Sequence, residues 1–268
     1  MKTAIAIFCA AVTSAANAQS TQYPQALVKG AAYKKSTWLI SACTFNIGKQ
    51  SITINVNSLT NKTYNVQDAD GNNTTFAVTT ENVADTVDAI GQKAIYNSDG
   101  GQSQIDNAIK NEAGSQAIIT TNNAGVVTAV NNAPAQYTSD AMLAFSGIHP
   151  IQYNQGEALG LLNTLKLSPN MAKGYKWEDS TIGDGNRTIT KYSIAKVTPA
   201  ATTVNYLKSI FTDSINTNIN GIAIIDNATG LIISNNRETI SMGYGQVNGV
   251  IYIAARRIYT YESCYRSK

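Results

Sequence analysis

The sequence predicts a mainly β protein, with a curved antiparallel meander sheet and one or two short helices between two blocks of strands. Short runs of β-branched and aromatic residues are separated by Asx-Gly turns along most of the chain. Residues Ser51–Asn57 alternate strictly, with Ile52, Ile54 and Val56 on one side. Such alternation is typical of a strand with one buried and one wet face.

The first block of strands is predicted between residues 36 and 135. Residues 68–73 form an Asp- and Gly-containing turn between two β-rich runs, which indicates a hairpin. A second hairpin is expected across the turn at 122–125. The strands of this block are expected at residues 37–40, 51–57, 63–66, 75–79, 93–96, 116–120 and 126–130.

The middle of the chain, residues 136–172, is predicted to be helical and to join the two strand blocks. Ser139–Ser146 carries Met142 and Phe145 behind a Ser cap. Gln155–Leu167 places leucines, including Leu159 and Leu162, at helical spacing and ends before Pro169. Two short helices are therefore expected here.

The second block, residues 173–268, is predicted to repeat the pattern of the first. Asn186–Val197 is expected as a long strand, and Thr202–Phe211 fits both helix and strand, with strand preferred. The C-terminal stretch, residues 220–265, is expected to form successive hairpins. Their strands lie at 221–225, 231–234, 239–242 and 250–261, with turns at 226–230 and Asn235–Asn236. The two blocks are loosely alike, so two similar halves within one domain are one interpretation.

The N-terminus is expected to be a cleaved bacterial signal peptide. Lys2 precedes the apolar run Ala4–Val12, and Ala16–Ala18 forms a small-x-small cleavage site. Cleavage after Ala18 would leave residues 19–268 as a single domain in the periplasm or the medium. No later stretch is long and apolar enough for a membrane span.

Two cysteines, Cys43 and Cys264, lie outside the leader. An exported protein with two cysteines is expected to join them in a disulfide. That bridge would fasten the last strand to the first. Two separate free thiols remain the alternative.

The charge pattern argues against several functional classes. The formal net charge is only +3, without a clustered basic patch, so nucleic-acid binding is not expected. The adjacent Arg256 and Arg257 fall in a strand and should point to opposite faces. The turn that begins at Asp68 lacks the Gly and the acidic residue that complete a calcium loop, so neither a metal nor a cofactor is expected.

The sequence favours a binding or structural role over catalysis. His149 is the single histidine, and no Gly-x-Ser-x-Gly elbow accompanies it. Glu178 and Asp179 are adjacent, so on a strand they would face opposite sides rather than work as a carboxylate pair. A hydrolase remains the third hypothesis.

The leading hypothesis is an apolar or amphipathic ligand, such as a lipid, held between the sheet and the helices. Its candidate contact residues are Met142, Phe145, Leu159, Leu162 and Trp177. The same side chains would also serve as ordinary core in a solid domain. The alternative function is a structural or surface-interaction domain that binds an envelope protein and no small ligand, and the oligomeric state is left open.

The segments Lys173–Glu178 and Gly221–Ile233 carry a resemblance at the level of architecture. The chain resembles the half-barrel carriers of the bacterial periplasm, such as the lipoprotein-carrier and mycobacterial lipoprotein families. It also resembles uncharacterised secreted bacterial domains of the same plan. The resemblance implies a strongly curved antiparallel sheet that is lined by apolar side chains and plugged by helices.

Overall fold

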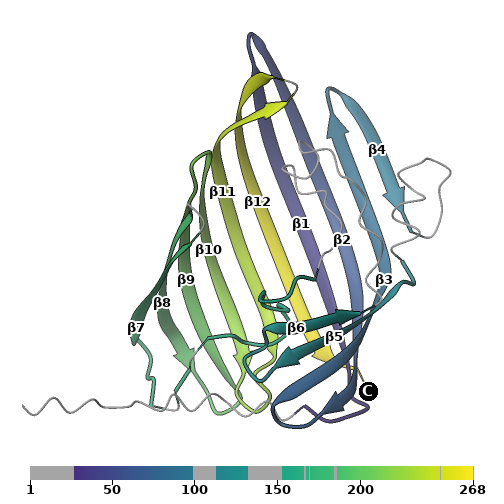
Figure 1. Cartoon of the computed structure of the whole chain (residues 1–268), viewed down its shortest axis with the longest axis vertical. Coiled ribbons are helices and arrows are strands. Elements are labelled where there is room, and N and C mark those ends of the chain that lie inside the picture. Colours follow the sequence, from purple (N-terminus) through teal and green to yellow (C-terminus); the bar gives the residue numbers. More distant parts are fainter. Residues whose placement is uncertain are drawn as a thin grey trace, which may run out of the picture.

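The structure, a computed structural model, describes residues 27–98, 113–131, 153–165, 167–168, 170–183, 186–247 and 249–267. These residues form a single antiparallel sheet, whose long strands run side by side in a curved layer (Figure 1). The strands are β1 (Ala32–Ile47), β2 (Gln50–Ala69), β3 (Asn73–Ala89), β4 (Gln92–Asn97), β5 (Gln116–Asn122), β6 (Val127–Asn131), β7 (Lys176–Gly183), β8 (Asn186–Val197), β9 (Ala201–Phe211), β10 (Ile215–Asp226), β11 (Ile232–Val247) and β12 (Val250–Arg266).

The first and last strands pair in the middle of the sheet. The strand order is β6-β5-β3-β2-β1-β12-β11-β10-β9-β8-β7, with β4 added beside β3. The pairing of β1 with β12 runs from Tyr33 opposite Arg266 to Asn46 opposite Ile253. All strands from the N-terminal block therefore lie on one side of this pair, and all strands from the C-terminal block lie on the other. In Figure 1, β5 and β6 cross the lower end of the long strands.

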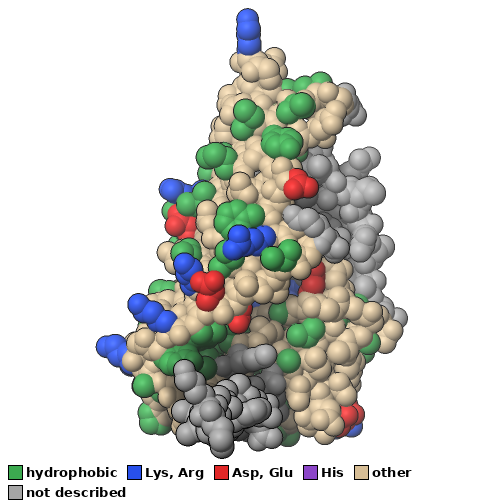
Figure 2. Space-filling view, turned by 60° about the vertical axis from the view of Figure 1, so that its left-hand side comes forward, with side chains coloured by type: hydrophobic (Ala, Val, Ile, Leu, Met, Phe, Trp, Pro, Cys, Tyr) green, Lys and Arg blue, Asp and Glu red, His purple; other side chains and the backbone are tan. Residues whose placement is uncertain are grey.

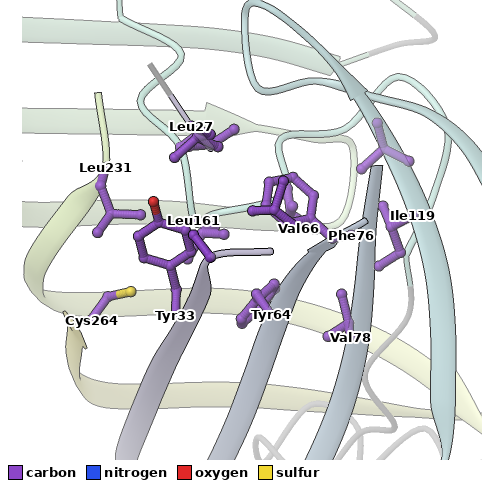
Figure 3. Packing of buried hydrophobic residues seen from close by; sticks show 14 of the residues in the cluster. Leu27, Tyr33, Tyr64, Val66, Phe76, Val78, Ile119, Leu161, Leu231 and Cys264 are labelled. Carbon is purple, nitrogen blue, oxygen red and sulfur yellow. The ribbon is translucent and has the colours of Figure 1, made fainter. Parts of the chain in front are cut away.

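The core lies on one face of the sheet, which we call the inner face. Strand alternation sends Phe45, Val56 and Val204 to this face, and each is at most 2% exposed. The largest buried cluster lies at the lower end of β1, β2 and β3. Figure 3 shows Tyr33, Tyr64, Phe76 and Leu161 packed together in it.

Asx residues form the tight turns, as the sequence predicts. Between β2 and β3, the Asp70 carboxylate accepts the backbone N–H groups of Asn72 and Asn73 at 2.8 and 2.7 Å. Between β10 and β11, Asp226 accepts those of Ala228 and Thr229. Because these bonds fix an Asx turn, the Asp70 carboxylate is engaged by its own loop rather than presented to a cation.

Most of the predicted strands are confirmed, although the observed strands are longer. The ambiguous segment Thr202–Phe211 lies in β9 and is a strand. The turn expected at Asn235–Asn236 is wrong, because β11 runs unbroken from Ile232 to Val247. Both asparagines pair with β10 and β12, so their backbone groups are used by the ladder.

The helix expected over Gln155–Leu167 is also wrong. The described residues of this range contain turns and isolated bridges but no helix. Gly156 and Gly160 adopt φ angles of 85° and 71°, in the left-handed region, which a right-handed helix excludes. The helix expected over Ser139–Ser146 lies outside the described residues.

The predicted disulfide does not form in this fold, although β12 does pair with β1. Cys43 lies opposite Arg256, whereas Cys264 lies opposite Lys35. Eight residues of strand therefore separate the two cysteines, about 26 Å at about 3.3 Å per residue. A disulfide needs Cα atoms within about 7 Å, so both buried cysteines are free thiols.

The predicted split of the arginine pair is confirmed. Arg256 points to the inner face and donates to the Ser241 hydroxyl at 3.1 Å. Arg257 points to the outer face, where it contacts Glu238 at 3.2 Å. In the part of the chain that the structure describes, there is no helix with the length and apolar character to cross a membrane.

The surface is mixed in character. In the oblique view of Figure 2, hydrophobic side chains form separate patches among polar and charged ones. On the outer face of the sheet, a pair of aromatic side chains is exposed. Trp38 of β1 and Tyr261 of β12 are paired residues on this face, 44% and 41% exposed, with ring centroids 5.3 Å apart. The Trp38 indole N–H donates to Asn57.

Candidate functional site

A segment between β6 and β7 bridges two distant parts of the sheet on its inner face. We call residues 153–165 the bridging segment. At one end it bonds the β5–β6 hairpin, because Leu159 N–H donates to Gly125 O at 3.0 Å and Val127 N–H to Glu157 O at 2.8 Å. At the other end Ile232 N–H donates to Leu161 O and Asn163 N–H to Gly230 O. The segment is thus held by backbone bonds to both blocks of strands.

Glycine allows the close approach of the bridging segment to the β5–β6 hairpin. A Cβ atom at Gly125 would lie 2.9 Å from the Leu162 Cβ, closer than packed carbon atoms come. Gly125 also has a φ of 71°. Any other residue would therefore push the bridging segment away from the sheet.

A cavity of about 330 Å³ lies between the bridging segment and the inner face of β1, β2, β11 and β12. Its lining combines apolar side chains with polar and charged ones. The lining residues are Lys35, Thr37, Leu39, Ser58, Thr60, Lys62, Tyr64, Val127, Tyr153, Asn154, Glu157, Ala158, Leu159, Arg237, Thr260 and Glu262. Ligand pockets commonly measure about 300–1,000 Å³, so this volume fits a small ligand or one end of a larger one.

Glu262 lies at the centre of a buried charge cluster on one wall of the cavity. Its carboxylate contacts Lys35 Nζ at 3.1 Å and accepts a hydrogen bond from Arg237 Nη1 at 2.8 Å. Burial by itself favours the protonated acid, but Lys35 and Arg237 together outweigh it and lower the pKa of Glu262. The Glu262 carboxylate is therefore stabilised in its ionised form between two basic side chains.

Lys62 is the third cation of the lining and is only 7% exposed. Its ammonium group donates to the Tyr153 hydroxyl at 2.6 Å and lies 4.7 Å from the centre of the same ring. Lys62 also stands directly opposite Lys35 in the β1–β2 ladder. Like charges in directly opposed positions are unfavourable, so two lysines on the buried face break an ordinary rule of strand pairing.

A hydrogen-bonded chain extends from this cluster toward β9. Asn235 donates to Glu262 at 2.9 Å and accepts the Tyr206 hydroxyl at 2.8 Å. The Tyr206 ring covers Gly221, where an added Cβ would collide with the ring. Beyond Tyr206 lies a smaller cavity of about 170 Å³, which Leu165, Tyr192 and Ile225 help to line.

The predicted ligand-contact residues are not brought together as a set. Leu159 lines the main cavity, and Leu162 is fully buried beside it, bridged to Leu231. Trp177 lies on β7 at the edge of the sheet, stacked on Tyr192 with ring centroids 4.8 Å apart. Met142 and Phe145 lie outside the described residues.

The charged lining was missed because sequence reasoning looked for apolar contacts on helices. The strand pattern nevertheless contains a signal. The alternation that buries Ile52, Ile54 and Val56 continues through Ser58 and Thr60 to Lys62, and so places a lysine on the buried face. The same period in β12 places Glu262 inward together with Ile258.

Among the described residues, the other candidate from the sequence, the pair Glu178 and Asp179, is not arranged as a catalytic pair. Glu178 contacts Lys191 at 3.9 Å on the exposed strand β7, and its neighbour Asp179 faces the other side. His149 lies outside the described residues. Among the described residues, no cluster of His, Cys, Asp and Glu could hold a metal ion.

A groove is also present on the outer face of the sheet, beside the central strands. It measures about 550 Å³ and is lined by residues of β1 to β4 that include Trp38, Leu59 and Ile95. Leu59 and Ile95 are exposed by 36% and 67%. This groove holds no charged cluster comparable to that around Glu262 among its described residues.

The comparisons with known proteins support the fold. No family model and no curated protein sequence matches the chain. A structure of lipovitellin, described for its lipid–protein interactions, matches with a TM-score of 0.53 and 13% identity, covering 90% of this chain and 26% of that one. The chain thus spans about a quarter of lipovitellin, and the likeness shows a β-rich fold.

Two bacterial structures are more distant. An outer-membrane channel from Pseudomonas putida F1 matches with a TM-score of 0.26 and 8% identity, covering 90% of this chain and 98% of that one. OccK7 from Pseudomonas aeruginosa matches with a TM-score of 0.29 and 6% identity, covering 89% and 100%. Scores this low support no conclusion about this chain. The likeness to lipovitellin supports a β-rich fold.

Proposed function

We propose that this protein is an exported, non-enzymatic β domain that binds an amphipathic ligand in the cavity under the bridging segment. The observation that carries the proposal is the lining of that cavity. Leu39, Val127 and Leu159 form an apolar part, while Lys35, Lys62 and Arg237 form a charged part. A ligand with one apolar and one polar end matches both.

The fold supports the proposal in a second way. The bridging segment is bonded to both blocks of strands, so the cavity has a roof that is fixed in place. Lipid–protein interactions are described for lipovitellin, whose sheet architecture resembles this one. The same plan of a curved sheet with a covered inner face characterises the periplasmic half-barrel carriers that the sequence resembles.

The proposal predicts that purified protein carries or takes up an amphiphile in this cavity. Organic extraction followed by mass spectrometry should recover a bound amphiphile, and a twelve-carbon amphiphile should bind in calorimetry. Ala158→Trp would place a large ring in the cavity and should reduce binding at least about tenfold, because the ligand and the ring compete for the same space. Ala228→Trp, in the exposed turn before β11, is the matched control and should bind normally.

Clean extracts combined with no uptake of any amphiphile would contradict the proposal. Equal binding by Ala158→Trp and the wild type would place the ligand elsewhere. In either case the outer groove with Trp38 and Leu59 becomes the candidate surface, and a protein partner of the envelope becomes the better hypothesis.

Export is tested separately. Expression of the full chain in a Gram-negative host, followed by fractionation and intact mass, should give a periplasmic or extracellular protein that begins at Gln19. A cytoplasmic protein that retains Met1–Ala18 would refute this part of the proposal and leave the cavity unaffected.

A further inference from the structure

We infer that the polar end of the ligand is an anion, such as a phosphate or carboxylate head group, bound between Lys35, Lys62 and Arg237. This inference rests on the proposed function, because it identifies the chemical class of the ligand of the same cavity. The placement of the charged side chains in the cavity indicates an anion. An amphipathic ligand needs a polar end, but that need alone does not explain why the polar lining is basic.

The first observation is the direct opposition of two buried lysines. Lys35 and Lys62 are cross-strand partners on the inner face, where side chains of opposed residues lie about 4.5–5.5 Å apart at Cβ. The Lys35 side chain is 11% exposed and Lys62 is 7% exposed. Lys35 donates to the Gly160 carbonyl at 2.8 Å and contacts Glu262, while Lys62 donates to the Tyr153 hydroxyl. Both lysines nevertheless line one cavity at low exposure, so an anion bound there would be attracted by both.

The second observation is that the protein's own acid is already shared. Glu262 contacts both Lys35 and Arg237, and it also accepts from Asn235. The described lining holds three basic residues, Lys35, Lys62 and Arg237, against two acidic ones, Glu262 and Glu157. Glu157 is exposed at the rim and bonds Asn154, so the inner part of the cavity is the more basic part.

The third observation is the density of neutral donors beside the cations. The hydroxyls of Thr37, Thr60 and Thr260 line the same wall, and Thr37 stands directly opposite both Thr60 and Glu262. Phosphate and carboxylate oxygens accept several hydrogen bonds at once, from cations and from hydroxyls. An anionic head group would be attracted by the three cations of the lining, whereas an uncharged alcohol would gain no such attraction and a cationic amphiphile would be repelled.

The test separates the two ends of the ligand. Delipidated full-length protein is titrated with dodecyl phosphate, dodecanol and inorganic phosphate below their aggregation limits. Dodecyl phosphate should bind at least about tenfold more tightly than either of the others, because only it offers both an anion and an apolar chain. Raising the salt concentration should weaken dodecyl phosphate and leave dodecanol unchanged.

The key variant is Lys62→Met, which keeps the length of the side chain and removes the charge. It should lose at least about tenfold in dodecyl phosphate affinity with no change for dodecanol. Without ligand its melting temperature reports separately the loss of the Tyr153 hydrogen bond and cation–π contact, so the comparison of the two probes, and not the melting temperature, tests the inference. Lys191→Met, on the exposed β8 strand, is the matched control and should bind as the wild type does.

Each outcome decides. If dodecanol binds as tightly as dodecyl phosphate and Lys62→Met changes neither, the anion inference is overturned and the proposed amphiphile site survives. If inorganic phosphate binds as tightly as dodecyl phosphate and Lys62→Met abolishes both, the anion site stands and the amphiphile is overturned. If none of the three probes binds, both are overturned. Should Lys62→Met fail to fold, Lys62→Arg, which retains the charge, must retain dodecyl phosphate binding for the inference to hold.

Discussion

At the scale of single residues, the inner face combines tight packing with unusual polarity. Gly221 allows the Tyr206 ring to lie across β10 and reach Asn235, which in turn bonds Glu262. Asp85 illustrates the opposite situation: its Oδ1 atom is buried without a hydrogen-bond partner, and burial raises the pKa of the carboxyl. The inner face therefore combines side chains fixed by packing and hydrogen bonds with a buried polar atom, Asp85 Oδ1, that has no hydrogen-bond partner.

We predict that Gly221→Ala destabilises the protein by about 1–3 kcal/mol, the usual cost of overpacking. The new Cβ would collide with the Tyr206 ring and displace the hydroxyl from Asn235. Gly183→Ala, at a strand end where a Cβ meets nothing within 4 Å, is the control and should be nearly neutral. Urea unfolding of the three proteins would measure the difference, and equal midpoints would contradict the Tyr206 position.

The two free thiols give a prediction about alkaline pH. Burial raises the pKa of Cys43 and of Cys264 from 9.0 to about 11, while Arg256 and Lys35, respectively, act in the opposite direction. A folded-state pKa above the unfolded value contributes stability that is complete below about pH 9 and is lost as the pH rises through 11. The wild type should therefore lose more stability between these pH values than the Cys43→Ala, Cys264→Ala double variant.

Urea unfolding at pH 8 and near pH 11 measures the stability that each protein loses. Because both proteins contain the same lysines and tyrosines, the difference between their losses reports the two thiols. Alkylation in denaturant without reductant should label both cysteines. Equal losses of stability in the two proteins would contradict the raised pKa values of buried thiols. A protein that resists alkylation would indicate a disulfide, which this strand register excludes.

At the scale of elements, the strands differ greatly in how they are held. β1 pairs along its length with β2 and β12, whereas β7 pairs only with β8 and ends the sheet. Seven of the eight residues of β7 are exposed. Sheet edges with free backbone groups are the places where strands open most easily or accept another strand.

We predict that amides of Lys176–Gly183 exchange with deuterium at least about tenfold faster than those of the inner part of β12. Few apolar contacts hold β7, while β12 is paired on both sides. Hydrogen exchange with peptide-level mass spectrometry would resolve the two strands. Protection of β7 as high as that of β12 at every protein concentration would contradict a free edge. Protection of β7 that grows with concentration would show that a second chain covers it.

At the scale of the whole molecule, local patterns predicted much of the sheet and little of the site. Alternation in Ser51–Asn57 and the Asx turns at Asp70 and Asp226 depend on neighbouring residues, so they are visible in the sequence. The helix predicted for this region was wrong because the conformation of the bridging segment depends on hydrogen bonds to Gly125 and Gly230, which are distant in the sequence. The cavity depends on the register that opposes Lys35 and Lys62 and brings Glu262 to both, which no local pattern specifies.

The pairing of β1 with β12 also has a consequence for the time course of folding. Lys35 and Cys264 are ladder partners although 264 − 35 = 229 positions separate them. Each block of strands can form hairpin by hairpin from neighbouring residues, but the central seam cannot close before the last strand has emerged and found the first. Non-local strand pairing of this kind is slow, and until it occurs β1 and β12 are long unpaired edges open to association with other chains. The charged cavity therefore comes into existence only when the seam between β1 and β12 closes, because Glu262 reaches Lys35 only then.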